Sequence, residues 1–145
     1  MAVIDEAFTR TEAWTPEAGA ATEALVQLQT DAALELPTEY VEFLRRSNGG
    51  EGEFGTEPGW FQIWPAEEVI QYNREYEVQR WLPGFFAFGS SGGGMLFVFD
   101  TRSGEPWRVL AVDSVGMEDL ENAIEIGLSF ASFLACVGTV WENNG

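Results

Sequence analysis

The sequence predicts a single α+β domain in which a mostly antiparallel, twisted sheet packs with N-terminal and C-terminal helices. The chain has 145 residues, the size of one domain, and its hydrophobic content of 46%, with 14% aromatic residues, is enough to build a sizeable core. Apolar residues at helical spacing dominate the first third, whereas strand-like runs between glycines and prolines dominate residues 84–114. We expect residues 1–14 to form an arm or a short helix and residues 15–140 to form the domain.

The first long helix is expected to begin at Thr15-Pro16-Glu17. A hydroxyl cap, a proline in the first turn and an acid near the positive end of the helix all favour helix initiation. Apolar residues then recur at steps of three and four until the helix ends near residues 31–35, which is typical of an amphipathic helix. This apolar side consists of Ala18, Ala21, Leu25, Leu28 and Ala32.

The most fully specified element is a second helix in residues 36–50. Pro37 suits the first turn, where a missing N–H costs nothing. Glu42 and Arg46 stand four apart in the favourable acid-first order and are expected to pair on the outer side. Asn48-Gly49-Gly50 then ends the helix, because these residues tolerate the left-handed geometry of a C-terminal cap. The inner side consists of Leu36, Tyr40, Phe43, Leu44 and Ser47.

A loop, a short strand and a third helix are expected next. Glycine and proline content predicts the loop over residues 51–59, and residues 60–64 alternate as a strand that ends before a proline. The strand is expected to present Phe61 and Ile63 on one face and Trp60, Gln62 and Trp64 on the other. The helix is expected to begin at Pro65 and to end before Pro83, with an inner stripe of Val69, Tyr72 and Tyr76.

The second half of the chain predicts a three-stranded meander followed by a last helix. Residues 85–89, 95–100 and 107–113 are rich in aromatic and branched side chains, and glycine-rich or proline-containing turns separate them. The middle strand is apolar on both faces, so we expect it to be covered on both. Residues 117–126 are interpreted as a short helix or an acidic loop. The last helix has a compact apolar stripe of Phe130, Phe133, Leu134 and Val137, and Gly138 ends it.

The second helix also carries a family resemblance. Leu-Pro-x-x-Tyr-x-x-Phe-Leu followed by Asn-Gly-Gly resembles the signature of the SUKH superfamily. Two further matches follow in the expected order, a glycine run at residues 88–94 and a Ser-Phe-x-x-Phe-Leu ending, so the similarity spans roughly residues 15–138. The motif positions, which the resemblance implies to be structural, are Leu36, Pro37, Tyr40, Phe43, Leu44, Asn48, Gly49, Gly50, Gly92, Gly93, Ser129, Phe130, Phe133 and Leu134. This group includes a yeast cell-wall synthesis regulator and many bacterial immunity proteins that neutralise polymorphic toxins.

Charge is the unusual feature of the composition. There are 24 acidic residues against seven basic ones, all arginine, and the net charge is −17. Such a chain repels nucleic acid and anionic lipid surfaces and favours basic proteins as partners. The alternative is that acidity serves only solubility or reflects a salty cytoplasm, because net charge by itself speaks to solubility rather than to function.

The missing residue types exclude most common catalytic sites. Without histidine there is no triad of the usual kind and no histidine metal site, and without lysine there is no Schiff base and no Walker A lysine. The single Cys136 is expected to be a packed thiol, which rules out an internal disulfide and fits a reducing compartment. No run of residues is long and apolar enough to cross a bilayer, and the start of the chain lacks a signal-peptide pattern. We therefore expect a cytoplasmic protein without catalytic residues, cofactor or metal.

Two glycine-rich segments resemble ligand loops without fulfilling their requirements. A phosphate cradle at residues 89–94 needs a helix behind it, whereas an aromatic strand follows, so a hairpin turn is the simpler interpretation. The loop with Glu51, Glu53 and Glu57 lacks calcium-loop spacing, so a solvated acidic edge is favoured over a metal site. Abundant carboxylates keep an enzyme based on acidic residues open as a third alternative.

Six tryptophans exceed what a core of this size requires. We expect most to be buried, and Trp60 and Trp107 to be the exceptions, because tryptophan is a common anchor of protein interfaces. The predicted partner-binding residues are Glu51, Glu53, Glu57, Trp60 and Trp107.

These observations favour a non-catalytic protein-binding domain. What the resemblance adds is the hypothesis of an immunity protein, which would neutralise a basic toxin by covering its active site. The alternative is a regulatory or scaffold module that binds a housekeeping partner, as the yeast regulator suggests. A neighbouring gene for a large secreted toxin would distinguish the two.

Overall fold

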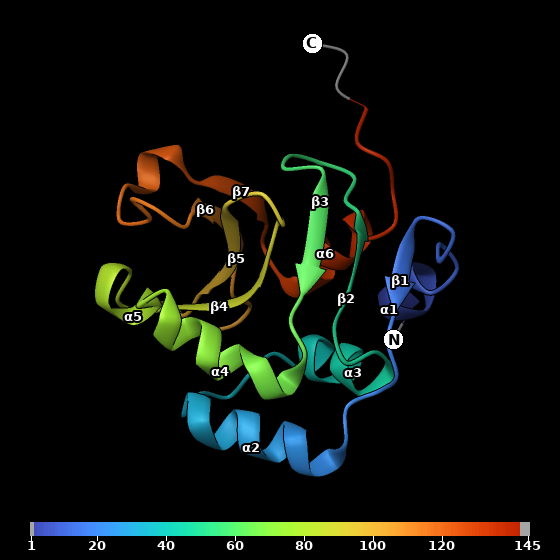
Figure 1. Ribbon diagram of the computed structural model, residues 1–145, viewed down its shortest axis with the longest axis horizontal. Helices are drawn as coiled ribbons and strands as arrows, with labels where there is room; N and C mark the ends of the chain where they lie inside the picture. The colour runs from blue at the N-terminus through green and yellow to red at the C-terminus, as the bar shows by residue number, and fades with distance from the viewer. Residues whose placement is uncertain (1, 143–145) are drawn as a thin grey trace.

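The computed structural model describes residues 2–142 (Figure 1). The strands are β1 (Trp14–Pro16), β2 (Gly50–Glu53), β3 (Trp60–Ile63), β4 (Phe85–Ser90), β5 (Met95–Asp100), β6 (Val109–Asp113) and β7 (Ile124–Gly127). The helices are α1 (Ala2–Ala7), α2 (Thr22–Ala32), α3 (Thr38–Arg46), α4 (Ala66–Glu75), α5 (Val78–Trp81) and α6 (Phe130–Cys136), with a short 3-10 helix at Leu120–Asn122.

The seven strands form one sheet in which the spatial order follows the chain from β1 to β7, and every neighbouring pair is antiparallel. Figure 1 shows β1–β3 on one side of the molecule and β4–β7 on the other, with α2, α3 and α4 along the bottom of the view and α6 behind the strands. The predicted α+β class is confirmed.

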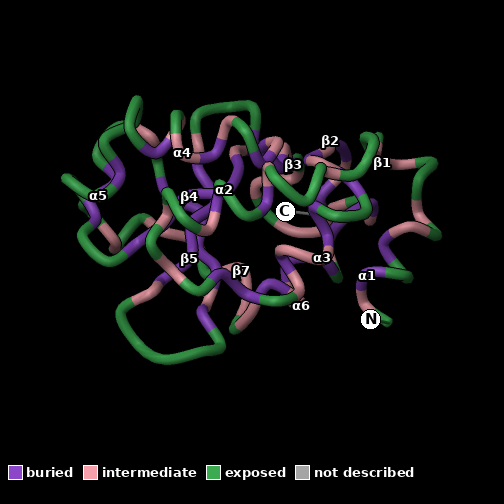
Figure 2. Tube along the Cα trace, turned by 90° about the horizontal axis from the view of Figure 1, so that it is seen from below, coloured by how far each residue is buried: buried purple, intermediate pink, exposed green. Residues whose placement is uncertain are grey.

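Aromatic side chains fill the core between the sheet and the helices α3 and α6. The ring of Tyr40 lies 5.4 Å from those of Phe99 and Phe130, and Phe88 lies 5.2 Å from Phe133. The buried stretches, purple in Figure 2, run along the central strands β4 and β5. The Tyr40 hydroxyl is fully buried and has no hydrogen-bond partner in the described part of the chain, and burial raises its pKa.

The motif of the second helix joins three elements. Asn48 accepts a hydrogen bond from the backbone N–H of Ala66 at 2.7 Å and donates one to Glu67 at 2.8 Å, so its side chain serves the start of α4. Gly49 has a φ of +99°, and a Cβ there would lie 2.6 Å from the carbonyl oxygen of Ile63. The predicted left-handed cap at Asn-Gly-Gly is not observed, because α3 ends at Arg46 and its C-cap, Ser47, is extended with a φ of −145°. Gly49 instead lets the chain pass close to β3.

The ion pair expected between Glu42 and Arg46 on α3 is not formed. Glu42 pairs with Arg45 at 3.3 Å rather than with Arg46. Arg46 instead pairs with Asp5 of α1 and lies over the ring of Phe8, 4.1 Å from its centroid. A tertiary partner therefore replaces the local one.

Three short strands were not predicted. Thr15-Pro16-Glu17 is not a helix start, because Trp14–Pro16 is β1 and pairs with β2. Strand β2 begins at Gly50 and occupies the first residues of the predicted loop. The first long helix starts only at Thr22, and Ala18 and Ala21 are exposed outside it. Residues 117–126 contain a helical turn and the first three residues of β7. In each case the stabilising ladder partner lies elsewhere in the chain.

Candidate functional site

The outer side of β1–β3 carries a surface of carboxylates around one indole. Cα pairing places Thr15 opposite Glu51, Glu51 opposite Gln62, and Glu53 opposite Trp60. Successive residues of a strand point to opposite faces, so these side chains share the face turned away from the buried Phe61. We call this surface the acidic face and define it by Glu12, Glu17, Glu51, Glu53, Trp60 and Gln62.

Two hollows meet on the acidic face, and Glu51 borders both. One, of about 490 Å3, lies between the segment after β1 and the end of β3, and its lining includes Glu17, Asn48 and Gln62. The other, of about 400 Å3, lies beside β1, and its lining includes Glu12, Glu53 and Trp60. The surface is therefore recessed enough to receive side chains of a partner.

Hydrogen bonds fix the centre of the acidic face. The amide of Gln62 donates to Glu51 at 3.0 Å, and the hydroxyl of Ser90 donates to Gln62 at 2.9 Å. Ser90 in turn accepts from the backbone N–H of Gly92 at 3.3 Å. A Cβ at Gly92 would lie 3.5 Å from the indole of Trp60, so the glycine turn after β4 borders the exposed ring. Polar contacts across three strands thus position Glu51 without neutralising it.

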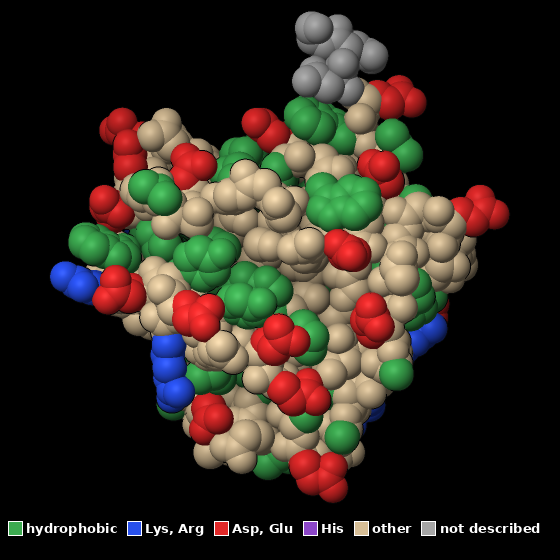
Figure 3. Space-filling model, in the orientation of Figure 1, with side chains coloured by type: hydrophobic (Ala, Val, Ile, Leu, Met, Phe, Trp, Pro, Cys, Tyr) green, Lys and Arg blue, Asp and Glu red, His purple; other side chains and the backbone are tan. Residues whose placement is uncertain are grey.

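The acidic face contains no cation among the described residues. The ion pairs of the described residues involve Arg45, Arg46, Arg80, Arg102 and Arg108, and none includes an acid of this face. Arg10 donates to the carbonyl groups of Leu134 and Val137 instead. Figure 3 shows acidic side chains spread over this side of the molecule, with arginines only at its margins. These carboxylates are available to an external cation.

The structure brings together three of the five predicted partner-binding residues. Glu51 and Glu53 lie on β2, and Trp60, 39% exposed, lies opposite Glu53. Glu57 is exposed in the turn between β2 and β3. Trp107 lies apart from them, and the expectation that it is exposed was wrong, because it is only 8% exposed. Its ring lies 5.9 Å from that of Phe99 and extends the core beside β5.

A row of aromatic rings beside the acidic face was not predicted. The ring of Trp64 lies 4.6 Å from that of Tyr72, which lies 6.5 Å from that of Tyr76. We expected both tyrosines on the inner stripe of α4, but Tyr76 is 38% exposed, and the buried residues of this helix are Ala66, Val69 and Asn73. The negative charge of Glu68, followed by burial, raises the pKa of Tyr72. Hydrophobic groups, green in Figure 3, extend across this side.

The burial of Asn73 explains why α4 turns a different side toward the core than the predicted one. The Asn73 side chain donates to the carbonyl oxygen of Ala87 at 2.8 Å and accepts from the N–H of Ala87 at 2.9 Å. An asparagine can be buried when its amide is satisfied in this way. The spacing of Ala66, Val69 and Asn73 is helical, so the signal was present in the sequence, but the polar residue masks it.

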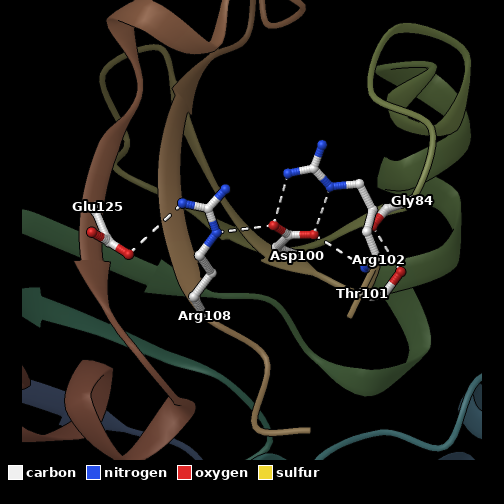
Figure 4. A network of polar contacts seen from close by, with 6 residues as sticks. All are labelled: Gly84, Asp100, Thr101, Arg102, Arg108 and Glu125. Atoms are coloured by element: carbon white, nitrogen blue, oxygen red, sulfur yellow. Dashed lines mark hydrogen bonds and ion pairs between the residues drawn. The ribbon is translucent and has the colours of Figure 1, made fainter. Parts of the chain in front are cut away.

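A second charged region surrounds Asp100 at the end of β5 (Figure 4). Its buried carboxylate accepts two hydrogen bonds from the guanidinium of Arg102, at 2.9 and 3.0 Å, and one from Arg108 at 2.9 Å. The hydrogen bonds from Arg102 hold the pKa of Asp100 well below its usual range. Arg108 also approaches Glu125 at 3.8 Å. This carboxylate is fully engaged, so its role is structural.

Carboxylates and the single thiol of Cys136 are potential metal-ligating and nucleophilic groups of residues 2–142. No group of three or more histidine, cysteine, aspartate or glutamate side chains in this range could hold a metal ion. Cys136 is half-buried, and burial raises the pKa of its thiol, against a smaller opposite effect of Arg10. Within the same range, no helix has the length and apolar character required to cross a membrane.

The fold is that of a single-domain α+β protein, and its acidic face combines exposed carboxylates with the partly exposed indole of Trp60. The model of the SMI1/KNR4 family (SUKH-1) matches residues 19–136, and the chain belongs to this family. The resemblance found in the sequence motifs is thereby confirmed. A comparison with curated proteins found no match. Membership is consistent with a non-catalytic role in protein–protein interaction.

Proposed function

We propose that this protein is an immunity protein that binds a basic toxin through the acidic face and covers the toxin's active site. The observation that carries the proposal is a group of carboxylates around the exposed indole of Trp60, none of which forms an ion pair with another described residue. In this proposal the protein acts in the cytoplasm and catalyses no reaction.

The glutamates and the tryptophan have different roles in the proposed complex. Glu51 and Glu53 on the acidic face, together with Glu57 in the turn that joins β2 to β3, attract a basic surface over a distance, which raises the association rate. Trp60 buries its ring against the partner, which slows dissociation. Trp107 is left out of the proposed contact because almost all of its surface is already buried.

The test begins with the toxin domain encoded by a neighbouring gene and measures its binding kinetics with the immobilised protein. The triple variant Glu51→Gln, Glu53→Gln, Glu57→Gln should lower the association rate about tenfold at low salt, with little change in dissociation. Trp60→Ala should instead raise the dissociation rate.

A matched control separates a local effect from a change in net charge. Glu23, Glu35 and Glu105 are exposed and form no ion pair among the described residues, so their triple glutamine variant removes the same charge elsewhere. Its association rate should stay close to that of the wild type. Equal losses in both triple variants would show that only net charge matters. A housekeeping protein captured through the acidic face, with no toxin gene nearby, would favour the regulatory alternative.

A further inference from the structure

The sheet closes most of its free backbone edges. The first half of β4 has no paired strand on the β3 side, because β3 pairs only with residues 89 and 90. There the side chain of Asn73 binds both backbone groups of Ala87, and Gln79 donates to the carbonyl oxygen of Phe85 at 2.9 Å. Helix α4 and the segment after it therefore replace the missing strand.

The edge at β1 is closed by other means. The strand has three residues, and one of them is Pro16, which has no N–H to donate. Short edge strands and edge prolines are established ways in which proteins prevent unwanted strand pairing.

The edge at β7 has no strand paired with it in the described residues, although the strand has only four residues and its register with β6 shifts between Val109 and Leu110. The strand pairs with β6 alone, and in residues 2–142 no other backbone group hydrogen-bonds residues 124–127. It contains no proline and no basic residue. Its one charged side chain, Glu125, approaches Arg108 on the face of the sheet. An open edge of this kind is a template for an added strand.

The side chains around β7 suit an added strand. Ile124 and Ile126 pack against the core on one face yet remain partly exposed, so they can be covered further. Leu128, directly after the strand, is 71% exposed. Its side chain is apolar surface that a neighbouring strand could bury.

The acidic residues around β7 favour a basic partner. Glu118, Asp119 and Glu121 are exposed in the segment that leads into β7, and Glu125 adds a fourth acid, against the single cation of Arg108. A second copy of a chain with a net charge of −17 would be repelled, whereas a basic segment would be attracted. We propose that β7 accepts an extended, basic segment of a partner protein as an eighth strand. This surface lies at the opposite end of the strand order from the acidic face, and the proposal does not depend on the latter's function.

Two peptide probes test the strand addition. The first is a short peptide of alternating arginine and valine, and the second has a central valine replaced by proline, which keeps the charge but removes an N–H from the ladder. Amide chemical shifts and hydrogen exchange of the intact protein are recorded during titration with each peptide. The first peptide should shift the amides of residues 124–128 and protect the outward-facing ones from exchange. The proline peptide should bind about tenfold more weakly, as expected when one or two hydrogen bonds are lost.

A protein variant and its control complete the test. Leu128→Lys places a like charge beside the peptide and should weaken binding, whereas Val26→Lys, at a 60% exposed position of α2, should not. Equal affinities of the two peptides would overturn the proposal, since binding would then depend on charge alone. Shifts confined to β1–β3 would also overturn it. If β7 instead paired with a second copy of this chain as the protein concentration rose, in the absence of peptide, the proposal of a basic partner segment would be wrong.

Discussion

Asp100 and Glu51 show how differently this chain treats its carboxylates. Asp100 is buried and engaged by two arginines, whereas Glu51 is exposed and receives only the neutral amide of Gln62. Among residues 2–142, two arginines form ion pairs with Asp100, and no arginine forms an ion pair with an acid of the acidic face. The difference teaches that the pattern of pairing, rather than the count of acids, locates a surface that is free for a cation.

The largest expected effect concerns the core that supports both regions. Phe43→Ala should lower the free energy of unfolding by about 3–5 kcal/mol, because Phe43 is fully buried and its loss leaves a cavity. Glu39→Ala, on the outer part of the same helix, should change it by less than about 0.5 kcal/mol. Chemical denaturation measures both, and equal effects would mean that the orientation of α3 is wrong.

The next prediction compares the contributions of Asp100 and Glu51 to stability. Asp100→Asn should cost about 2 kcal/mol of stability, the range of hydrogen bonds to charged groups. Glu51→Gln should cost less than about 0.5 kcal/mol, because an exposed acid without a cation loses little. Urea denaturation of both variants checks this. If Glu51→Gln were as costly as Asp100→Asn, the acidic face would be structural.

The pH dependence of stability separates the two regions further. The pKa of Asp100 is lowered in the folded state, so its stabilising contribution is fully present above the unfolded pKa of about 4 and is lost progressively as the pH falls from there toward the lower folded pKa. The difference in unfolding free energy between the wild type and Asp100→Asn should therefore be constant near neutral pH and shrink in acid. Denaturation curves from neutral pH down to about pH 3 measure it. A constant difference throughout would contradict the ion pair.

Tyr40 provides a smaller effect of opposite sign. Its hydroxyl is buried without a partner in the described residues, in contrast to the fully bonded Asp100. Tyr40→Phe should raise stability by about 1 kcal/mol, because an unsatisfied buried polar group is removed. Thermal denaturation against the wild type decides the sign. A loss of stability would show that the hydroxyl has a partner in solution.

Sequence reasoning succeeded where a local pattern and the tertiary structure agree. The spacing of Tyr40, Phe43 and Leu44 predicted the buried side of α3, and the alternation around Phe61 predicted the inner face of β3. Trp60 was expected to be exposed and is. These residues lie in elements whose own periodicity determines which side is buried.

Sequence reasoning failed where a distant partner decides the conformation. β1, β2 and β7 have three or four residues each and are stabilised by neighbours in the sheet rather than by their own propensity. Asn73 is buried only because Ala87 satisfies its amide. The grouping of Glu51 with Trp60 on the acidic face could be predicted because the two residues are close in the chain. The aromatic row beside the acidic face could not be predicted in this way.

The most direct test of the central claim is the salt dependence of the association rate with the toxin domain. Screening weakens attraction between exposed charges, so the wild-type rate should fall steeply as ionic strength rises. The triple glutamine variant at Glu51, Glu53 and Glu57 should show a clearly shallower slope, and the two rates should converge at high salt. Parallel slopes, with the variant as sensitive to salt as the wild type, would contradict the account and place the binding surface elsewhere.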